Sequence, residues 1–224
     1  MSYVSHLECS ANCGAAPLDP HEQHHLCSCG MPLLVRYHLD RVADIWKKST
    51  LVDRPPTMWR YKEMMPLLGD GDPVTLGEGF TPLFHAKSLG QKLGLQALYI
   101  KDESLNPTNS FKARGLSAAV TRARALKAHT LSVPSAGNAA NAMAAYAAQA
   151  GIPAKVFMPK DVKQPFIREC ELYGADVTLV DGLITDAGRL AAERGGPLGW
   201  YDVATLKEPY RIEGKKTMAY ELAE

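Results

Sequence analysis

One lysine lies at a position that favours its neutral amine over the usual ammonium form. Lys112 lies in "NPTNSFKARG" (106–115), directly after a Pro-Thr-Asn-Ser turn and at the predicted start of a helix. The N-terminus of a helix carries partial positive charge, which disfavours an ammonium group and favours the neutral amine. The neutral amine is the form that attacks an aldehyde. A lone lysine is more often a solvated surface group, so this interpretation needs a second feature.

A second stretch has the composition of an anion-binding turn. The segment "PSAGNAANAMAAYAAQAG" (134–151) follows a predicted strand and begins with small residues at 135–137. Main-chain N–H groups there can approach a ligand at a helix N-terminus, where unpaired donors and the helix dipole favour an anion. The alternative is a tight turn before a helix that packs closely through alanines. Asn138 lies 26 positions after Lys112, about one helix, a turn and a strand, so both are expected at one crevice.

A cysteine cluster marks the N-terminal region. Four of the five cysteines lie within the first thirty positions, namely Cys9, Cys13, Cys27 and Cys29. In a reducing compartment such a cluster binds metal more readily than it forms disulfides. The spacings C-x3-C and C-x-C differ from the C-x2-C pairs of zinc ribbons, so a zinc site and a metal-free remnant remain alternative predictions. His24 and His25 are alternative ligands, and Cys170 is predicted to be a small buried hydrophobic residue.

Alternating elements are predicted to position these residues. Short β-type runs alternate with helical patterns from about residue 95 onward, which predicts an α/β fold with a parallel sheet covered by helices. The predicted strands are "ALYIKDE", "TLSVP", "AKVFMP", "DVTLV" and "GWYDV". The predicted helices cover about 111–127, 138–150, "QPFIRECELYG", "LITDAGRLAAERG" and "EGKKTMAYELAE". Ser110 is predicted to cap the first helix, Gly151 to end the second, and "TRARALK" to form a solvated helix face.

Composition excludes several classes of protein. The chain has 224 residues, 46% hydrophobic and 22% charged, with a formal net charge of +1, so nothing indicates a nucleic-acid partner. No apolar run approaches the roughly 20 residues that span a bilayer. The start "MSYVSHLECSANCG" has no signal-peptide pattern, so a cytoplasmic location without membrane association is expected.

Several segments together resemble one enzyme family. "NPTNSFKARG" and "PSAGNAANAMAAYAAQAG" are similar to the segments around the cofactor lysine and the substrate turn of fold type II (tryptophan synthase β-type) pyridoxal-phosphate enzymes. "LGEGFTPL", "YIKDESLNPT" and "EPYRIEGKKTMAYELAE" resemble threonine synthases, and the likeness covers roughly 75–224. The Cys-rich start is similar to the ribbon-like element that precedes some threonine-synthase-like chains.

The resemblance implies roles for individual residues. Lys112 would form the internal aldimine with pyridoxal 5'-phosphate and then carry protons. Phe111 would contact the cofactor and, with Ser110, shape the surroundings of the lysine. Asn138 would hydrogen-bond the ring hydroxyl of the cofactor. The residues that would cradle an acidic group of the substrate are Ser135, Ala136 and Gly137.

The reaction implied by the resemblance is that of threonine synthase. O-phosphohomoserine and water would give threonine and phosphate, in a carbon–oxygen lyase that acts on a small amino-acid substrate and forms a homodimer. A threonine or serine dehydratase and a non-catalytic relative are the alternatives. Two positions depart from the family pattern, because Asn109 replaces a glycine and Ala113 replaces an aspartate. Asn109 is expected to preserve the turn, since asparagine tolerates left-handed backbone angles.

The resemblance also implies a domain plan. The glycine-rich cofactor-phosphate loop of the family would lie beyond residue 224, so the chain resembles the front part of a longer enzyme. The chain alone is not expected to be active. Residues 1–40 would form the Cys-rich element, and residues 41–115 would begin a larger cofactor-binding domain. Residues 116–210 would form a smaller α/β domain, and residues 211–224 would return to the larger one.

Overall fold

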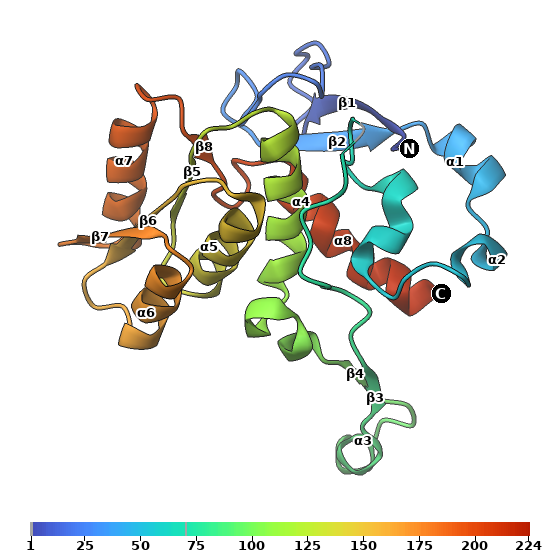
Figure 1. Ribbon diagram of the computed structural model, residues 1–224. Coiled ribbons are helices and arrows are strands. Elements are labelled where there is room, and N and C mark those ends of the chain that lie inside the picture. The colour runs from blue at the N-terminus through green and yellow to red at the C-terminus, as the bar shows by residue number, and fades with distance from the viewer. Residues whose placement is uncertain (1, 70) are drawn as a thin grey trace.

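A four-stranded parallel sheet organises the fold. The computed structural model describes residues 2–69 and 71–224. The strands are β5 (Leu131–Pro134), β6 (Ala154–Pro159), β7 (Asp176–Val180) and β8 (Tyr201–Asp202). They run in the order β7-β6-β5-β8, with Leu131 of β5 paired to Ala154 on one side and to Tyr201 on the other (Figure 1). This arrangement confirms the predicted α/β class.

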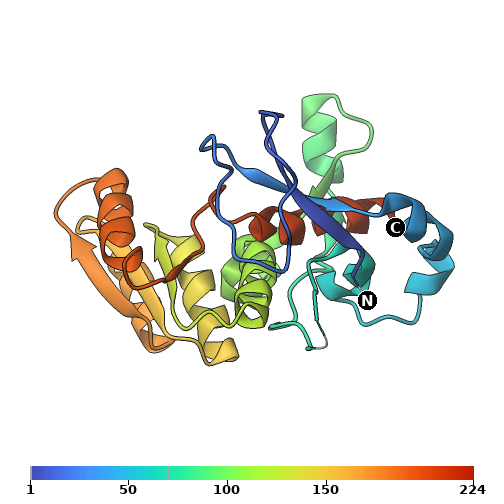
Figure 2. The same ribbon diagram turned by 90° about the horizontal axis from the view of Figure 1, so that it is seen from above.

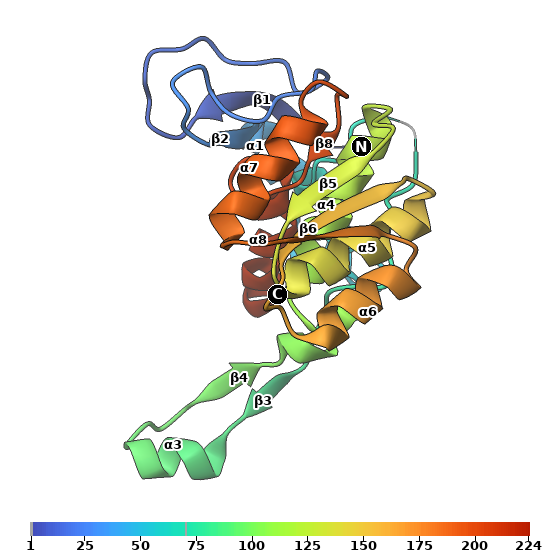
Figure 3. The ribbon, with the colours of Figure 1, turned by 90° about the vertical axis from the view of Figure 1, so that its left-hand side faces the viewer.

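Helices cover both faces of the sheet. On one face lie α5 (Asn138–Ala150) and α6 (Gln164–Leu172), and on the other lies α7 (Ile184–Gly195) (Figure 3). A hydrophobic core lies on each face of the sheet, and strand β6 contributes side chains to both, because side chains alternate along a strand. Val156 and Met158 pack in the main core with α5, whereas Phe157 packs with Ala187 and Ala191 of α7.

Helix α4 (Lys112–Ala125) is more deeply buried than its sequence predicted. It lies between α5 and α8 (Tyr210–Ala223), and every residue from Ala113 to Ala123 is buried (Figure 2). The prediction of a solvated "TRARALK" face is therefore wrong at Arg122, which is 2% exposed. The Arg122 guanidinium donates to the main-chain oxygen of Pro20 and lies 5.6 Å from the centre of the Tyr210 ring.

Two glycines let α4 and α8 cross at very short distance. A Cβ atom on Gly214 of α8 would lie 1.9 Å from the main-chain oxygen of Arg114 in α4. A Cβ atom on Gly115 of α4 would lie 2.9 Å from the main-chain oxygen of Arg211. Helix α8 begins three residues before the predicted segment, because the buried Glu208 carboxylate accepts the N–H of Arg211 at 2.8 Å and so caps the first turn.

A projecting arm contains the strand predicted from "ALYIKDE". It consists of β3 (Leu83–His85), α3 (Lys87–Leu93) and β4 (Tyr99–Lys101), and it extends away from the rest of the chain (Figure 3). The expected place of this strand in the parallel sheet is wrong, since β4 pairs antiparallel with β3. A partner so close in the chain costs little loop entropy, which favours the local pairing.

The N-terminal region packs against α8. Strands β1 (Val4–Cys9) and β2 (Leu33–Tyr37) form an antiparallel pair, followed by α1 (Leu39–Ile45), α2 (Lys48–Leu51) and the 3-10 helix η1 (Met58–Met64). Cys9, Cys27 and Tyr210 share one small hydrophobic core, so this region contacts the α/β part. In the described part of the chain, no helix is both long and apolar enough to cross a bilayer.

Candidate functional site

A strained turn lies directly before Lys112, the first residue of α4. Two 3-10 turns, η2 (Glu103–Leu105) and η3 (Pro107–Asn109), precede it. Asn109 adopts a left-handed φ of 53°, as expected from its side chain, and Thr108 has a φ of 57°. A left-handed β-branched residue is unfavourable, and such strain often accompanies functional sites. The N-cap residue of α4 is Phe111, one residue later than the predicted Ser110, and it makes no side-chain cap hydrogen bond. The hydroxyl of Ser110 nevertheless accepts the N–H of Lys112 at 3.3 Å.

The surroundings of Lys112 favour its neutral form. Burial lowers the pKa of Lys112 below its usual value, and the nearby Arg211 guanidinium lowers it further. The Nζ atom lies 4.0 Å from the centre of the Phe111 ring. No carboxylate of the described residues lies within ion-pair distance of the amine. The site can therefore present a reactive amine, which is the chemistry predicted for Lys112.

Helix α8 adds two cations that the sequence interpretation did not assign. Arg211 is 1% exposed, and its Nη1 donates to the main-chain oxygen of Val203 at 2.6 Å. Its Nε and Nη2 are buried and have no hydrogen-bond partner among the described residues. Lys215 lies one turn later, and burial, followed by Arg211 and Lys112, lowers its pKa to about 8. The i, i+4 spacing in "YRIEGK" could have indicated that these two side chains share one face.

The small-residue turn is brought near the lysine turn, since η3 packs against α5. The main-chain N–H of Ser135 is already used, because it donates to the oxygen of Phe157 at 3.0 Å. Any contribution of Ser135 to a ligand must therefore come from its hydroxyl. Ala136 is exposed and Gly137 is half-buried, so both can be approached from solvent. Asn138 is the exposed first residue of α5.

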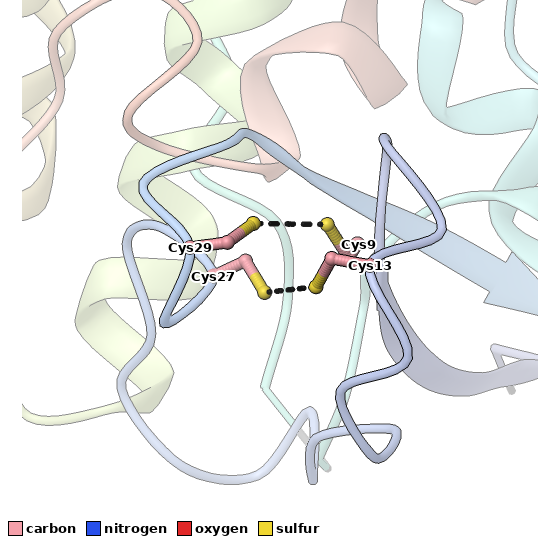
Figure 4. A group of neighbouring side chains, drawn as sticks. All are labelled: Cys9, Cys13, Cys27 and Cys29. Carbon is pink, nitrogen blue, oxygen red and sulfur yellow. Dashed lines mark hydrogen bonds between the residues drawn. The ribbon is translucent and has the colours of Figure 1, made fainter.

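The four N-terminal cysteines converge on one point. Their Sγ atoms all lie within 4.8 Å of one another, with Cys9 and Cys29 at 3.5 Å and Cys13 and Cys27 also at 3.5 Å (Figure 4). Sulfur ligands at about 2.3 Å from a tetrahedral zinc ion would lie about 3.8 Å apart. The cluster therefore has the dimensions of a tetrathiolate zinc site, although its sequence spacing is unusual.

Main-chain donors favour the thiolate form of two of these four cysteines. The N–H groups of Ala11 and Cys29 lower the pKa of Cys9 and Cys27, respectively. His25, an alternative ligand in the sequence analysis, lies outside the group and instead places its ring 5.3 Å from that of Tyr201. Cys170 is buried, as predicted, and its Sγ donates to the Asn141 side chain at 3.3 Å.

Comparison with known proteins places this site in a family. The sequence pattern described as "Pyridoxal-phosphate dependent enzyme" matches residues 74–224. The chain belongs to this family. Lys112, the turn at 135–137 and the Arg211–Lys215 face all lie within the matched residues, whereas the cysteine cluster lies before them.

The relatives of this pyridoxal-phosphate family member include curated threonine synthases. The threonine synthase of Methanosarcina acetivorans is 36% identical over 98% of this chain and 53% of its own length. That of Methanocaldococcus jannaschii is 33% identical over 97% of this chain and 54% of its own length. The predicted resemblance to threonine synthases is thus confirmed, and the chain spans about half the length of the curated relatives it matches.

Solved structures agree with the fold of this family. A diaminopropionate ammonia lyase from Escherichia coli, in complex with an aminoacrylate-PLP azomethine reaction intermediate, gives a TM-score of 0.62 at 25% identity. The match covers 67% of this chain and 44% of that chain. A threonine deaminase from Solanum lycopersicum gives 0.57 at 29% identity, over 63% of this chain and 39% of that chain. The predicted fold type II class is confirmed.

Proposed function

We propose that this chain forms part of a threonine synthase-like lyase that converts O-phosphohomoserine and water to threonine and phosphate. The observation that carries the proposal is the buried Arg211, whose Nε and Nη2 lack partners among the described residues. A buried guanidinium with free N–H groups is suited to a phosphate, which it can bind through two parallel hydrogen bonds. The resemblance to curated threonine synthases supports the same substrate.

The residues around Lys112 fit pyridoxal phosphate. A half-buried amine with a lowered pKa and no acidic partner in the described chain can bond to the aldehyde of the cofactor. The bound cofactor supplies an electron sink for charge that develops at the substrate carbon atoms. The amine of Lys112 would afterwards move protons at those atoms, while Phe111 limits its motion through the 4.0 Å contact. Asn138 would hydrogen-bond the ring hydroxyl of the cofactor.

The start of α5 would bind the carboxylate end of the substrate. The N–H groups of Ala136 and Gly137, together with the Ser135 hydroxyl, would supply the donors. Unpaired N–H groups and the dipole at a helix N-terminus both favour an anion. The carboxylate would then be held at α5 and the phosphate at α8, which keeps the reacting carbons beside Lys112.

A threonine or serine dehydratase is the second candidate. The structural similarity to a threonine deaminase supports it. A dehydratase substrate carries a hydroxyl in place of the phosphate and does not need a cluster of cations. The pair formed by Arg211 and Lys215 therefore favours the phosphate-bearing substrate.

We also propose that the four cysteines hold one structural zinc ion. The support is the convergence of their sulfur atoms within 4.8 Å and the N–H donors aimed at two of them. A closed set of four thiolates leaves no position for substrate, so such an ion would act on structure. Its role would be to fix the loop between Cys13 and Cys27.

Lys112→Ala tests the assignment of the cofactor lysine. Pyridoxal phosphate is added to the natural protein, the bound adduct is reduced with borohydride, and the labelled peptide is identified by mass spectrometry. The parent protein should be labelled on Lys112, and the variant should lose this label and turnover of O-phosphohomoserine. The control is Lys92→Ala, which removes an exposed lysine of α3 and should change neither result. A reducible adduct on another lysine, with turnover intact in Lys112→Ala, would show that the assignment is wrong.

A further inference from the structure

Lys215 is placed to act with Arg211 on one ligand. The two residues are four apart on α8 and so share a helix face. The stem of Lys215 lies over α4, where its Cε would be 3.4 Å from a Cβ atom on Gly115. Its Nζ lies 5.7 Å from the centre of the Phe111 ring, and Lys112 Nζ lies 4.0 Å from the same ring. The two amines thus lie over the same aromatic ring.

The basic groups of Lys112, Arg211 and Lys215 form no direct ion pair with a carboxylate of the described residues. The carboxylates of Glu208 and Asp202 both act on Arg211 from a distance and raise its pKa against the effect of burial. The Glu208 carboxylate already accepts the Tyr201 hydroxyl and the Arg211 N–H. The neighbouring Lys216, by contrast, is paired with Glu213. The positive charge without an ion-pair partner therefore lies on the face of α8 that carries Arg211 and Lys215, and not at Lys216.

We propose that Lys215 is a specificity-determining residue that supplies, with Arg211, the second cation for a phosphomonoester dianion. A carboxylate carries one negative charge, which a single guanidinium can match. A phosphate group carries up to two charges and three acceptor oxygens at neutral pH, so a second cation adds a further charge-assisted bond. The inference deepens the proposed function and rests on it for the identity of the substrate.

Binding of inorganic phosphate to the cofactor-loaded protein tests this site directly. Pyridoxal phosphate is kept at saturating concentration throughout, and calorimetry measures the dissociation constant of added phosphate. Lys215→Gln should weaken phosphate binding about 10–100-fold, as expected for the loss of one charge-assisted hydrogen bond. Lys215→Arg should retain affinity within a few-fold. The control, Lys92→Gln, removes the same charge from the exposed helix α3 and should leave the constant unchanged.

The outcomes separate this inference from the proposed function. Unchanged phosphate affinity in Lys215→Gln would overturn the role of Lys215, even if O-phosphohomoserine is turned over. The inference would also be overturned if phosphate binds only in the absence of cofactor and competes with cofactor for the same site. Arg211 and Lys215 would then bind the cofactor rather than the substrate phosphate. If phosphate binding depends on Lys215 but O-phosphohomoserine is not converted, the inference holds and the proposed function fails.

Discussion

Glu78 is a carboxylate with no exposure to solvent, held by donors from separate parts of the chain. It accepts the Trp59 indole N–H at 2.9 Å, the Tyr146 hydroxyl at 2.6 Å and the N–H of Leu76 at 2.9 Å. Burial and the Glu78 carboxylate both raise the pKa of Tyr146, so this hydroxyl remains a donor. Glu78 thus joins η1 and α5 to the "LGEGFTPL" segment in which it lies.

Replacing Glu78 should destabilise the protein strongly. Glu78→Gln places an NH2 group among groups that already donate, and it removes the charge that strengthens their hydrogen bonds. The free energy of unfolding should fall by about 2–5 kcal/mol, measured by urea denaturation, because hydrogen bonds to a charged group contribute about 1.5–3 kcal/mol each. The matched control, Glu193→Gln on the exposed face of α7, should change it by less than about 0.5 kcal/mol. Equal stability of the two variants would contradict the role given to Glu78.

The crossing of α4 and α8 sets how the three basic residues Lys112, Arg211 and Lys215 lie relative to one another. Lys112 begins one helix, and Arg211 and Lys215 lie in the first two turns of the other. The close approach at Gly115 and Gly214 brings these side chains toward one another. The site therefore depends on two residues that carry no functional group.

Gly214→Ala should separate the two helices. The added methyl group would meet the Arg114 main-chain oxygen at 1.9 Å, and backbone atoms cannot rotate away. We expect the free energy of unfolding to fall by at least about 3 kcal/mol, the upper end of the usual cost of overpacking, and phosphate binding to weaken. Gly188→Ala in α7 is the control, because its nearest contact would be an ordinary 3.9 Å and alanine favours a helix by up to about 1 kcal/mol. If Gly214→Ala unfolds at the same urea concentration as the control, the close crossing is not needed.

At the scale of the whole molecule, the Cys-rich region and the α/β part share contacts. Pro20 lies in the loop between the two cysteine pairs, and its main-chain oxygen accepts from Arg122 of α4 and from the Tyr210 hydroxyl of α8. Cys9 and Cys27 pack with Tyr210 in one core. A metal ion at the cysteines would therefore order a loop that covers buried groups of the α/β part.

Loss of the metal should lower the stability of the whole chain. We expect one zinc ion per chain by elemental analysis, and none after replacement of both Cys27 and Cys29 by serine. The helical content after residue 75 should persist, since its main core lies elsewhere. The melting temperature should fall, because ligand binding contributes about 4 kcal/mol when free zinc exceeds its dissociation constant a thousandfold. Cys170→Ala should keep the zinc, and a parent protein without metal after expression with added zinc would disprove the site.

The sequence by itself determined the local features of this protein. The alternation of strands and helices, the end of α5 at Gly151 and the left-handed turn at Asn109 all follow from short-range patterns and backbone preferences. Lys112 could be singled out because its place after a turn and at the start of a helix is visible in the sequence. The resemblance to threonine synthases could also be found from the sequence, because several short segments carry it in the same order along the chain.

Only the tertiary structure decided which distant groups meet. The sequence predicts Arg122 to be solvated, but packing between α4, α8 and the Pro20 loop buries it. The convergence of the four sulfur atoms and the addition of Arg211 and Lys215 to the surroundings of Lys112 depend on contacts between residues that lie apart in the sequence. Burial and charge at such points are properties of the packed arrangement, and local propensity does not encode them.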